Sequence, residues 1–319
     1  MKNVFYLPGF VERESLVRAI IEFNELDKKN GSLFFKDNIE LASYGCFPAC
    51  SWNGGRPIFG EVHPACVIRS VFEWYKNHNV KLQLTFTNSC LNKYDIYDRY
   101  ANKILDIGME YSNVEFKVGS QILEEYILSI YPEAKLVRSI KPRSKSLEGI
   151  EHLTIDDFKK YNGIVLPTMY NFNKEAIKKY IEIGEKTNTY IEILVNHCCI
   201  KECKAEHLHL SWCDRTQLFE EEANPGDEDK VSPCKVNGIF SEDRGYYTIP
   251  FSDIDKYNDI GVHHFKLRER AGGTFQDVPD TFIECVQYLV KDPQSIALLA
   301  GKLLPRITEA RPTYIVMSV

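Results

Sequence analysis

Short apolar runs alternate with stretches of helical hydrophobic spacing along nearly the whole chain. Residues 4–7 form a strand-like apolar run, and residues 12–24 place apolar side chains on one face of a helix. Further strands are expected at residues 39–44, 81–86, 114–118, 134–137, 164–166, 190–195, 246–249 and 262–267. Further helices are expected at residues 66–76, 96–107, 122–130, 175–183, 252–257, 282–290 and 295–304.

Strands that alternate with helices favour a parallel sheet with the helices packed outside it. About eight strands at this spacing predict an α/β fold, a complete or distorted (β/α)8 TIM-like barrel that forms one domain over residues 1–319. A cysteine-rich insertion at residues 196–234 follows a late strand, and closing helices are expected within residues 278–304. A doubly wound open sheet is the alternative, although no G-x-G-x-x-G sequence follows a strand to support its dinucleotide-binding form.

Polar residues follow the expected strands with some regularity. In a barrel they would face one another across one mouth, where barrel enzymes carry their chemistry. Each of these residue types is also common in ordinary turns, so the prediction of a site rests on the ring as a whole. The ring comprises Tyr44, Gly45, Thr87, Asn88, Ser120, Ser139, Thr168, Asn171, Asn196, His197, Lys266 and Arg268.

Charge and hydropathy narrow the functional classes. The chain has a formal net charge of −6, which disfavours bulk electrostatic binding of nucleic acid. The basic segment at residues 135–145 is more typical of a solvated loop. No apolar run reaches the roughly 18 residues of a membrane span, and Pro8 and Gly9 interrupt the first apolar run too early for a signal peptide. We therefore expect a cytoplasmic protein whose thiols stay reduced.

Five of the ten cysteines lie at residues 198–234, after the strand at residues 190–195. In a reducing compartment such a group indicates metal ligands or buried thiols rather than disulfides. Cys199 and Cys203 have the spacing of a zinc-ligand pair, but Cys213 and Cys234 stand far apart and form no second pair. Widely spaced thiolates suit an iron–sulfur cluster, so a cluster, zinc and free thiols all remain open at this stage.

Other residues bear on which metal site or reaction this segment supports. Glu206 occupies the third cysteine position of the C-x3-C-x2-C motif of radical enzymes that use S-adenosylmethionine, which disfavours that class. His209 is a candidate ligand or a hydrogen-bond donor to a sulfur. Cys46 or Cys50, in a loop after an early strand, is an alternative ligand. A cysteine nucleophile with His197 or His209 as base is a further alternative.

The run EILVNHCCIKECKAEHLH resembles the cysteine segment of the collagenase-like proteins, unassigned-peptidase family 32 (U32), which often read E-x-x-VN-E-x-C-x3-C before a histidine. Shorter matches in the family's order extend over nearly the whole chain. The matching residues are Tyr44–Gly45, Gly55–Arg56, 85–88, Tyr126, Tyr131–Pro132, Glu192, Val195, Asn196, Cys199, Cys203, His209, 232–234, 253–257, Gly261, 265–266 and Arg270. His197 departs from a common glutamate, and Phe251–Ser252 replaces a frequent Pro-Glu pair.

The resemblance implies a TIM-like barrel and a 4Fe–4S cluster, with zinc as the alternative cofactor. It implies an iron–sulfur-dependent enzyme that hydroxylates or modifies an aromatic or nucleobase substrate without oxygen. The alternatives are a peptidase or collagenase-like hydrolase, and a non-catalytic cluster-bearing subunit that works with a related partner chain. A small molecule and a nucleic acid both remain candidate substrates.

The resemblance also assigns candidate site residues. The implied cluster ligands are Cys199, Cys203, Cys213 and Cys234. The candidate substrate-binding residues are Arg56, Asn88, Asn196, His197, His209, Lys266 and Arg270. Among the basic residues, Arg56, Arg268 and Arg270 are candidate carboxylate clamps, because a planar guanidinium can bind a carboxylate through two hydrogen bonds.

Overall fold

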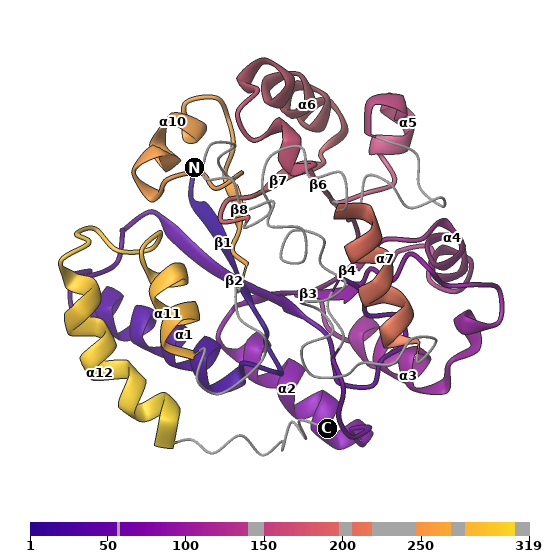
Figure 1. Cartoon of the computed structure of the whole chain (residues 1–319), viewed down its shortest axis with the longest axis horizontal. Coiled ribbons are helices and arrows are strands. Elements are labelled where there is room, and N and C mark those ends of the chain that lie inside the picture. Colours follow the sequence, from indigo (N-terminus) through magenta and orange to yellow (C-terminus); the bar gives the residue numbers. More distant parts are fainter. Residues whose placement is uncertain (56–57, 140–149, 198–205, 219–246, 269–277, 310–319) are drawn as a thin grey trace.

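A closed barrel of parallel strands forms the centre of the molecule (Figure 1). The computed structural model describes residues 1–55, 58–139, 150–197, 206–218, 247–268 and 278–309. Within these residues eight strands pair in sequence order, and β8 closes onto β1. The strands are β1 (Asn3–Pro8), β2 (Ile39–Gly45), β3 (Lys81–Phe86), β4 (Val114–Val118), β5 (Leu136–Arg138), β6 (Gly163–Val165), β7 (Tyr190–Leu194) and β8 (His264–Lys266). The predicted (β/α)8 architecture is confirmed.

Helices surround the barrel on its outside, as Figure 1 shows. Those in the described part of the chain are α1 (Glu14–Lys29), α2 (Ala65–Asn77), α3 (Arg99–Met109), α4 (Gln121–Ile130), α5 (Ile155–Phe158), α6 (Lys174–Thr187), α7 (Glu206–Gln217), α10 (Ile254–Asn258), α11 (Val278–Val286) and α12 (Ser295–Glu309). A search of the described helices finds none whose length and apolar character would let it cross a membrane.

One expected strand is wrong in its described part. Residues 247–249 form no strand, although a strand was expected at residues 246–249. The segment instead runs beside the end of β7, where the Ile249 N–H donates to the Val195 carbonyl at 2.6 Å. A short apolar run cannot by its sequence distinguish one such bond from a strand ladder.

The outward face of the strands builds the main hydrophobic core. Successive strand residues point to opposite faces, so one set of alternate positions packs under the helices. Phe5 of β1 and Phe265 of β8 stack with ring centroids 5.2 Å apart, and Phe86 of β3 stacks on Phe116 of β4 at 5.8 Å. These side chains are at most 1% exposed. The strand alternation therefore anchors the helical layer to the barrel.

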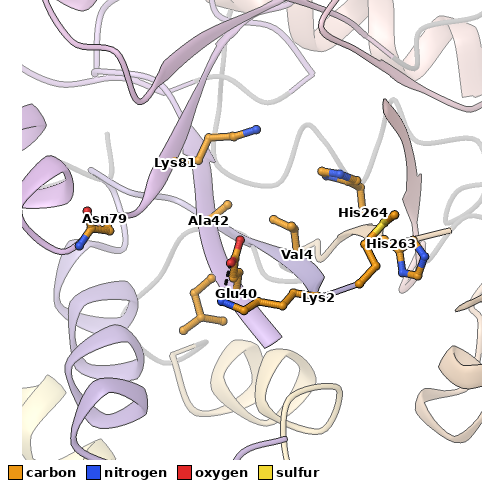
Figure 2. A pocket seen from close by; sticks show the side chains of 10 residues that line it. Lys2, Val4, Glu40, Ala42, Asn79, Lys81, His263 and His264 are labelled. Carbon is orange, nitrogen blue, oxygen red and sulfur yellow. Dashed lines mark hydrogen bonds and ion pairs between the residues drawn. The ribbon is translucent and has the colours of Figure 1, made fainter. Parts of the chain in front are cut away.

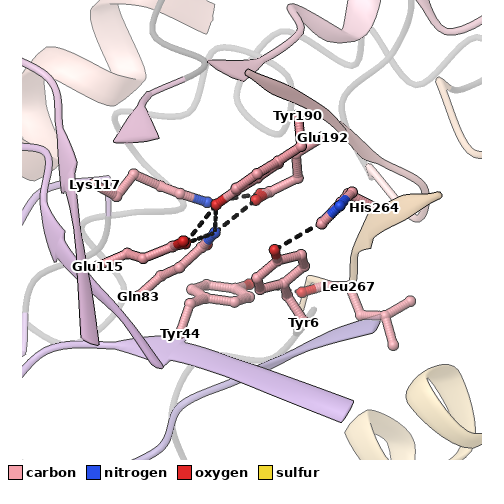
Figure 3. A network of polar contacts seen from close by, with 9 residues as sticks. All are labelled: Tyr6, Tyr44, Gln83, Glu115, Lys117, Tyr190, Glu192, His264 and Leu267. Atoms are coloured by element: carbon pink, nitrogen blue, oxygen red, sulfur yellow. Dashed lines mark hydrogen bonds and ion pairs between the residues drawn. The ribbon is translucent and has the colours of Figure 1, made fainter. Parts of the chain in front are cut away.

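The inward face is unusually polar. Barrel interiors are normally filled by branched apolar side chains, whereas here Gln83, Glu115, Lys117 and Glu192 are all buried and lie inside the barrel (Figure 3). Their positions alternate with outward apolar residues along β3, β4 and β7. Buried charges need partners, and these side chains provide them for one another.

Gly163 of β6 makes room for this interior. A Cβ atom built on Gly163 would lie 2.2 Å from the ring of Tyr190, far inside contact distance. The absence of a side chain at Gly163 therefore lets the Tyr190 ring extend across the inside of the barrel and join the polar set (Figure 3).

Candidate functional site at the carboxyl ends of the strands

Asn196 joins the ends of β7 and β8 at the barrel mouth. Its side-chain Nδ2 donates to the Arg268 carbonyl at 2.6 Å, and its Oδ1 accepts from the Arg268 N–H at 2.5 Å. A side-chain amide that bonds both the N–H and the C=O of one residue acts as a clamp on the chain. Asn196 was predicted to bind substrate, and in this structure it holds Arg268 in place beside the mouth.

His197 follows Asn196 and is also buried, at 7% exposure. Its ring nitrogen Nδ1 lies 3.4 Å from an Arg268 guanidinium nitrogen, and its carbonyl accepts from the Thr248 hydroxyl at 2.9 Å. The Tyr247 ring stacks on the imidazole with centroids 6.4 Å apart. The predicted substrate residue His197 thus lies where β7, β8 and the segment before α10 meet.

Asn88 follows β3 and is fully buried. Its Nδ2 donates to the carbonyls of Ser51 and Asp214, each at 3.0 Å, and its Oδ1 accepts from the Cys90 N–H at 2.9 Å. Asn88 therefore connects three separate segments around the mouth, including the helix that follows the cysteine segment.

Asp214 and Gln217 fix helix α7 onto the loops after β2 and β3. The Asp214 carboxylate accepts from the Gly55 N–H at 2.9 Å, and from the Ser89 N–H at 2.8 Å and hydroxyl at 2.6 Å. The Gln217 side chain accepts from the Ile58 N–H at 2.7 Å and donates to the Cys50 carbonyl at 3.1 Å. Both residues are at most 1% exposed. These buried bonds attach α7 to the mouth.

Cys213 precedes Asp214 on α7 and is 2% exposed. The buried bonds of Asp214 and Gln217 fix the helix that carries this thiol, so the position of the thiol relative to the mouth is fixed as well. The described residues hold no group of three or more histidine, cysteine or acidic side chains placed to bind one metal ion. The other implied ligands Cys199, Cys203 and Cys234 lie outside the described residues.

Some of the remaining predicted residues also lie outside the described residues, and the others are buried or only partly described. Arg56 and Arg270 lie outside the described residues, and His209 is described only as part of the α7 backbone. The alternative ligands Cys46 and Cys50 are both buried. Burial, together with the neighbouring Cys50 thiol, raises the pKa of the Cys46 thiol well above its usual value. A raised pKa disfavours the thiolate form that a metal requires.

Below the mouth, a buried ion pair crosses the barrel interior (Figure 3). Lys117 Nζ of β4 lies 2.6 Å from Glu192 Oε1 of β7, and both side chains are at most 1% exposed. Gln83 of β3 donates to the other carboxylate oxygen of Glu192 at 2.9 Å. Burial raises the pKa of Glu192, but Lys117, Lys266 and Gln83 outweigh it and lower the pKa overall. Glu192 is therefore held as a carboxylate.

Lys266, the last residue of β8, stands at the upper end of this network. Its Nζ lies 4.0 Å from the centroid of the Tyr44 ring. Burial and the nearby positive charge of Lys117 lower the pKa of Lys266 well below its usual value, although Glu192 opposes the shift. Three of the predicted substrate residues, Asn196, His197 and Lys266, lie close to Arg268. Asn88 instead contacts α7 through the Asp214 carbonyl.

The opposite end of the network opens into a cavity at the amino ends of the strands. The cavity measures about 420 Å³, and its polar lining includes Lys2, Glu40, Lys81 and His264 (Figure 2). His264 Nδ1 lies 2.9 Å from the Tyr6 hydroxyl. Burial, and then the positive charge of Lys81, lower the pKa of His264 to about 4.

This shift predicts a stability change with pH. Between about pH 6.5 and pH 4 the unfolded chain protonates His264 while the folded chain does not, so stability falls as the pH falls through this window. We expect His264 to account for about 2 kcal/mol of the loss, after allowance for its partial exposure. Urea unfolding of the wild type and His264→Asn at pH 7.5 and pH 4.5 measures it. Equal losses in the two proteins would contradict the assignment.

Sequence reasoning missed the interior network. Glu115 and Lys117 lie within the strand expected at residues 114–118, and Glu192 is named only among the residues that match the family motif. A signal was present, because β4 reads VEFKV, with charged residues at alternate positions of a strand flanked by helices. Strands buried on both faces are normally apolar throughout, so this alternation indicated charges inside the barrel.

The chain has only low sequence identity to the known proteins that it matches. No family model and no curated protein matches it. Among solved structures, the U32 peptidase Mk0906 is 12% identical with a TM-score of 0.49, over 85% of this chain and 94% of that one. A structure of S. aureus MnaA with UDP is also 12% identical, with a TM-score of 0.19 over 98% of this chain and 92% of that one. Neither likeness identifies an activity or a substrate for this chain.

Proposed function

We propose that this protein is an iron–sulfur-dependent enzyme of the kind that its motifs resemble. It would hold a 4Fe–4S cluster through Cys199, Cys203, Cys213 and Cys234 and modify an aromatic or nucleobase substrate. One observation supports this most directly: the described flanks of the cysteine segments are all bonded at the same end of the barrel.

The described residues beside the two cysteine segments lie at the barrel mouth. The first segment, residues 198–205, follows His197, which is fixed at the end of β7, and precedes α7, which Asp214 fixes to the loops after β2 and β3. The second segment, residues 219–246, follows α7 and comes shortly before Thr248, whose hydroxyl donates to the His197 carbonyl. The described neighbours of both segments therefore lie beside the mouth, where Cys213 is buried.

The chemistry of the surrounding residues fits an anionic or aromatic substrate. A bound cluster with an accessible iron supplies Lewis-acid or electron-transfer chemistry. Arg268 brings positive charge to the mouth, and Asn196 fixes its backbone. A carboxylate on the substrate would be attracted to the Arg268 guanidinium, while the Tyr247 ring beside His197 offers a flat apolar surface.

Metal analysis of protein purified without oxygen tests the proposal. We expect iron in the wild type and loss of most of it in each of Cys199→Ser, Cys203→Ser, Cys213→Ser and Cys234→Ser, because serine is a poor replacement for a thiolate ligand. Cys66→Ser is the matched control, since Cys66 is exposed on α2 and should not affect iron content.

Three outcomes would redirect or contradict the proposal. Zinc without iron, lost in the same four variants, would favour the zinc alternative. Iron retained in all four variants would contradict the ligand set. Peptide cleavage that persists after removal of the metal would favour the peptidase-like alternative, which the described contacts do not by themselves support.

A further inference from the structure

Lys266 occupies an unusual place for a lysine. It ends β8, pairs in register with Tyr6 of β1, and carries its amine at the mouth side of the barrel interior. Its side chain is only partly buried, whereas Lys117 is 1% exposed. Both amines lie over the Tyr44 ring, with Lys266 Nζ 4.0 Å and Lys117 Nζ 5.8 Å from its centroid. Lys266 is therefore the one of this pair that a molecule in the mouth could reach.

The carboxylates near Lys266 are already bonded to other groups. Glu192 already accepts from Lys117 on one oxygen and from Gln83 on the other. The next carboxylate, Glu115, pairs with Lys81 at 3.0 Å and accepts from the Tyr190 hydroxyl at 2.5 Å. Lys266 pairs in register with Tyr6 of β1 and lies over the Tyr44 ring of β2. Burial, Lys117 of β4 and Arg268 after β8 lower the pKa of Lys266, and Glu192 of β7 raises it.

This environment favours the neutral amine. Burial and the adjacent Lys117 ammonium both lower the pKa of Lys266. The Tyr44 ring opposes them, because an aromatic face stabilises a cation. The pKa of Lys266 nevertheless stays well below the usual lysine value, so burial and the charge of Lys117 outweigh the Tyr44 ring. A lysine beside a second cation in a desolvated site is a known arrangement for an amine nucleophile.

We propose that Lys266 is a catalytic amine that forms a Schiff base with an aldehyde or ketone bound at the barrel mouth. The inference goes beyond the proposed iron–sulfur function, because the condensation needs neither a metal nor an oxidant. The substrate class is a small carbonyl compound, and Arg268 beside the mouth favours one with a carboxylate.

The bond changes balance without a redox partner. The Lys266 lone pair forms a C–N bond to the carbonyl carbon, and the carbonyl oxygen takes up a proton to give a carbinolamine. Loss of this oxygen as water leaves a C=N bond, so amine and carbonyl give imine and water. The Lys117 ammonium is held by Glu192 and lies over the same Tyr44 ring as Lys266, which places a proton donor near the reacting amine. The Tyr44 hydroxyl is not assigned this role, because its proton is donated to the Leu267 carbonyl at 2.7 Å.

Reductive trapping on the full chain tests the proposal. The protein is incubated at pH 7 with glyoxylate and, separately, with propionaldehyde, reduced with sodium cyanoborohydride, and mapped by peptide mass spectrometry. We expect Lys266 to be modified at least about tenfold faster than Lys186, an exposed residue of α6, because each unit of lowered pKa raises the neutral fraction tenfold. Faster reaction with glyoxylate than with propionaldehyde would support the carboxylate preference.

The controls separate this proposal from the iron–sulfur one. The modification rates of different lysines are compared within one wild-type sample, so the result stands even where Lys266→Arg folds poorly. The same rates are measured in protein with iron and in protein without iron. Lys266→Arg should remove the fast modification and leave Lys186 unchanged. Modification of Lys266 no faster than Lys186 would overturn the proposal and leave Lys266 as a charged binding group. A fast Lys266 in protein without iron would support it even if no cluster forms.

Discussion

Replacing Lys117 with methionine is expected to lower the free energy of unfolding by about 3 kcal/mol at pH 7. The substitution leaves Glu192 as a carboxylate that is 0% exposed, with Gln83 as its remaining close partner. Removing one member of a buried pair costs roughly 3–5 kcal/mol, because the other charge stays desolvated. Lys266 is close enough to compensate in part, which places the expected loss at the lower end of that range.

Two further variants separate pairing from packing. Lys117→Met combined with Glu192→Leu removes both charges and should recover most of the loss. Lys2→Met, which breaks the exposed pair with Glu40, should cost less than about 1 kcal/mol. Urea unfolding monitored by circular dichroism measures all three. A loss in Lys117→Met no larger than that in Lys2→Met would show that the barrel interior is not held by this pair.

Replacing Asp214 with alanine should release helix α7 from the barrel mouth. The substitution leaves the Gly55 N–H and both donors of Ser89 without their acceptor. Unsatisfied buried donors cost about 1–3 kcal/mol each, and water entering the gap offsets part of this, so we expect a loss of about 3 kcal/mol. The iron content should fall with it, because Cys213 lies on the same helix.

Hydrogen exchange localises the effect of Asp214→Ala. A local loss of about 3 kcal/mol corresponds to roughly 100-fold faster exchange of the α7 amides, with little change in the amides of α6. Asp156→Ala is the control, since the Asp156 side chain is 85% exposed and should leave α7 unchanged. Unaltered exchange in α7 of the Asp214 variant would mean that other contacts fix this helix.

Much of the fold could be predicted because its signals are local. The alternation of short apolar runs with helical spacing gave the order of elements, and parallel pairing follows from that order. The segment at residues 246–249 was wrong in its described part because a short apolar run is ambiguous without its neighbours.

The interior and the attachment of α7 depend on contacts that sequence spacing does not encode. Lys117 and Glu192 are 75 residues apart, and they meet only because the barrel closes. Asp214 accepts from Gly55, which lies 159 residues earlier in the chain. Charged residues alternating in β4 indicated a polar interior, yet which cation pairs with which anion follows from barrel geometry. The ligand set and the substrate residues stay predictions.

The iron and acid-labile sulfide content of the wild-type chain, purified without oxygen, tests the central claim most directly. A cluster held at the barrel mouth by the cysteine segment requires about four iron and four sulfide per chain. Sulfide is decisive, because metal bound without a cluster brings none. Protein that carries zinc, or iron without sulfide, would contradict the claim.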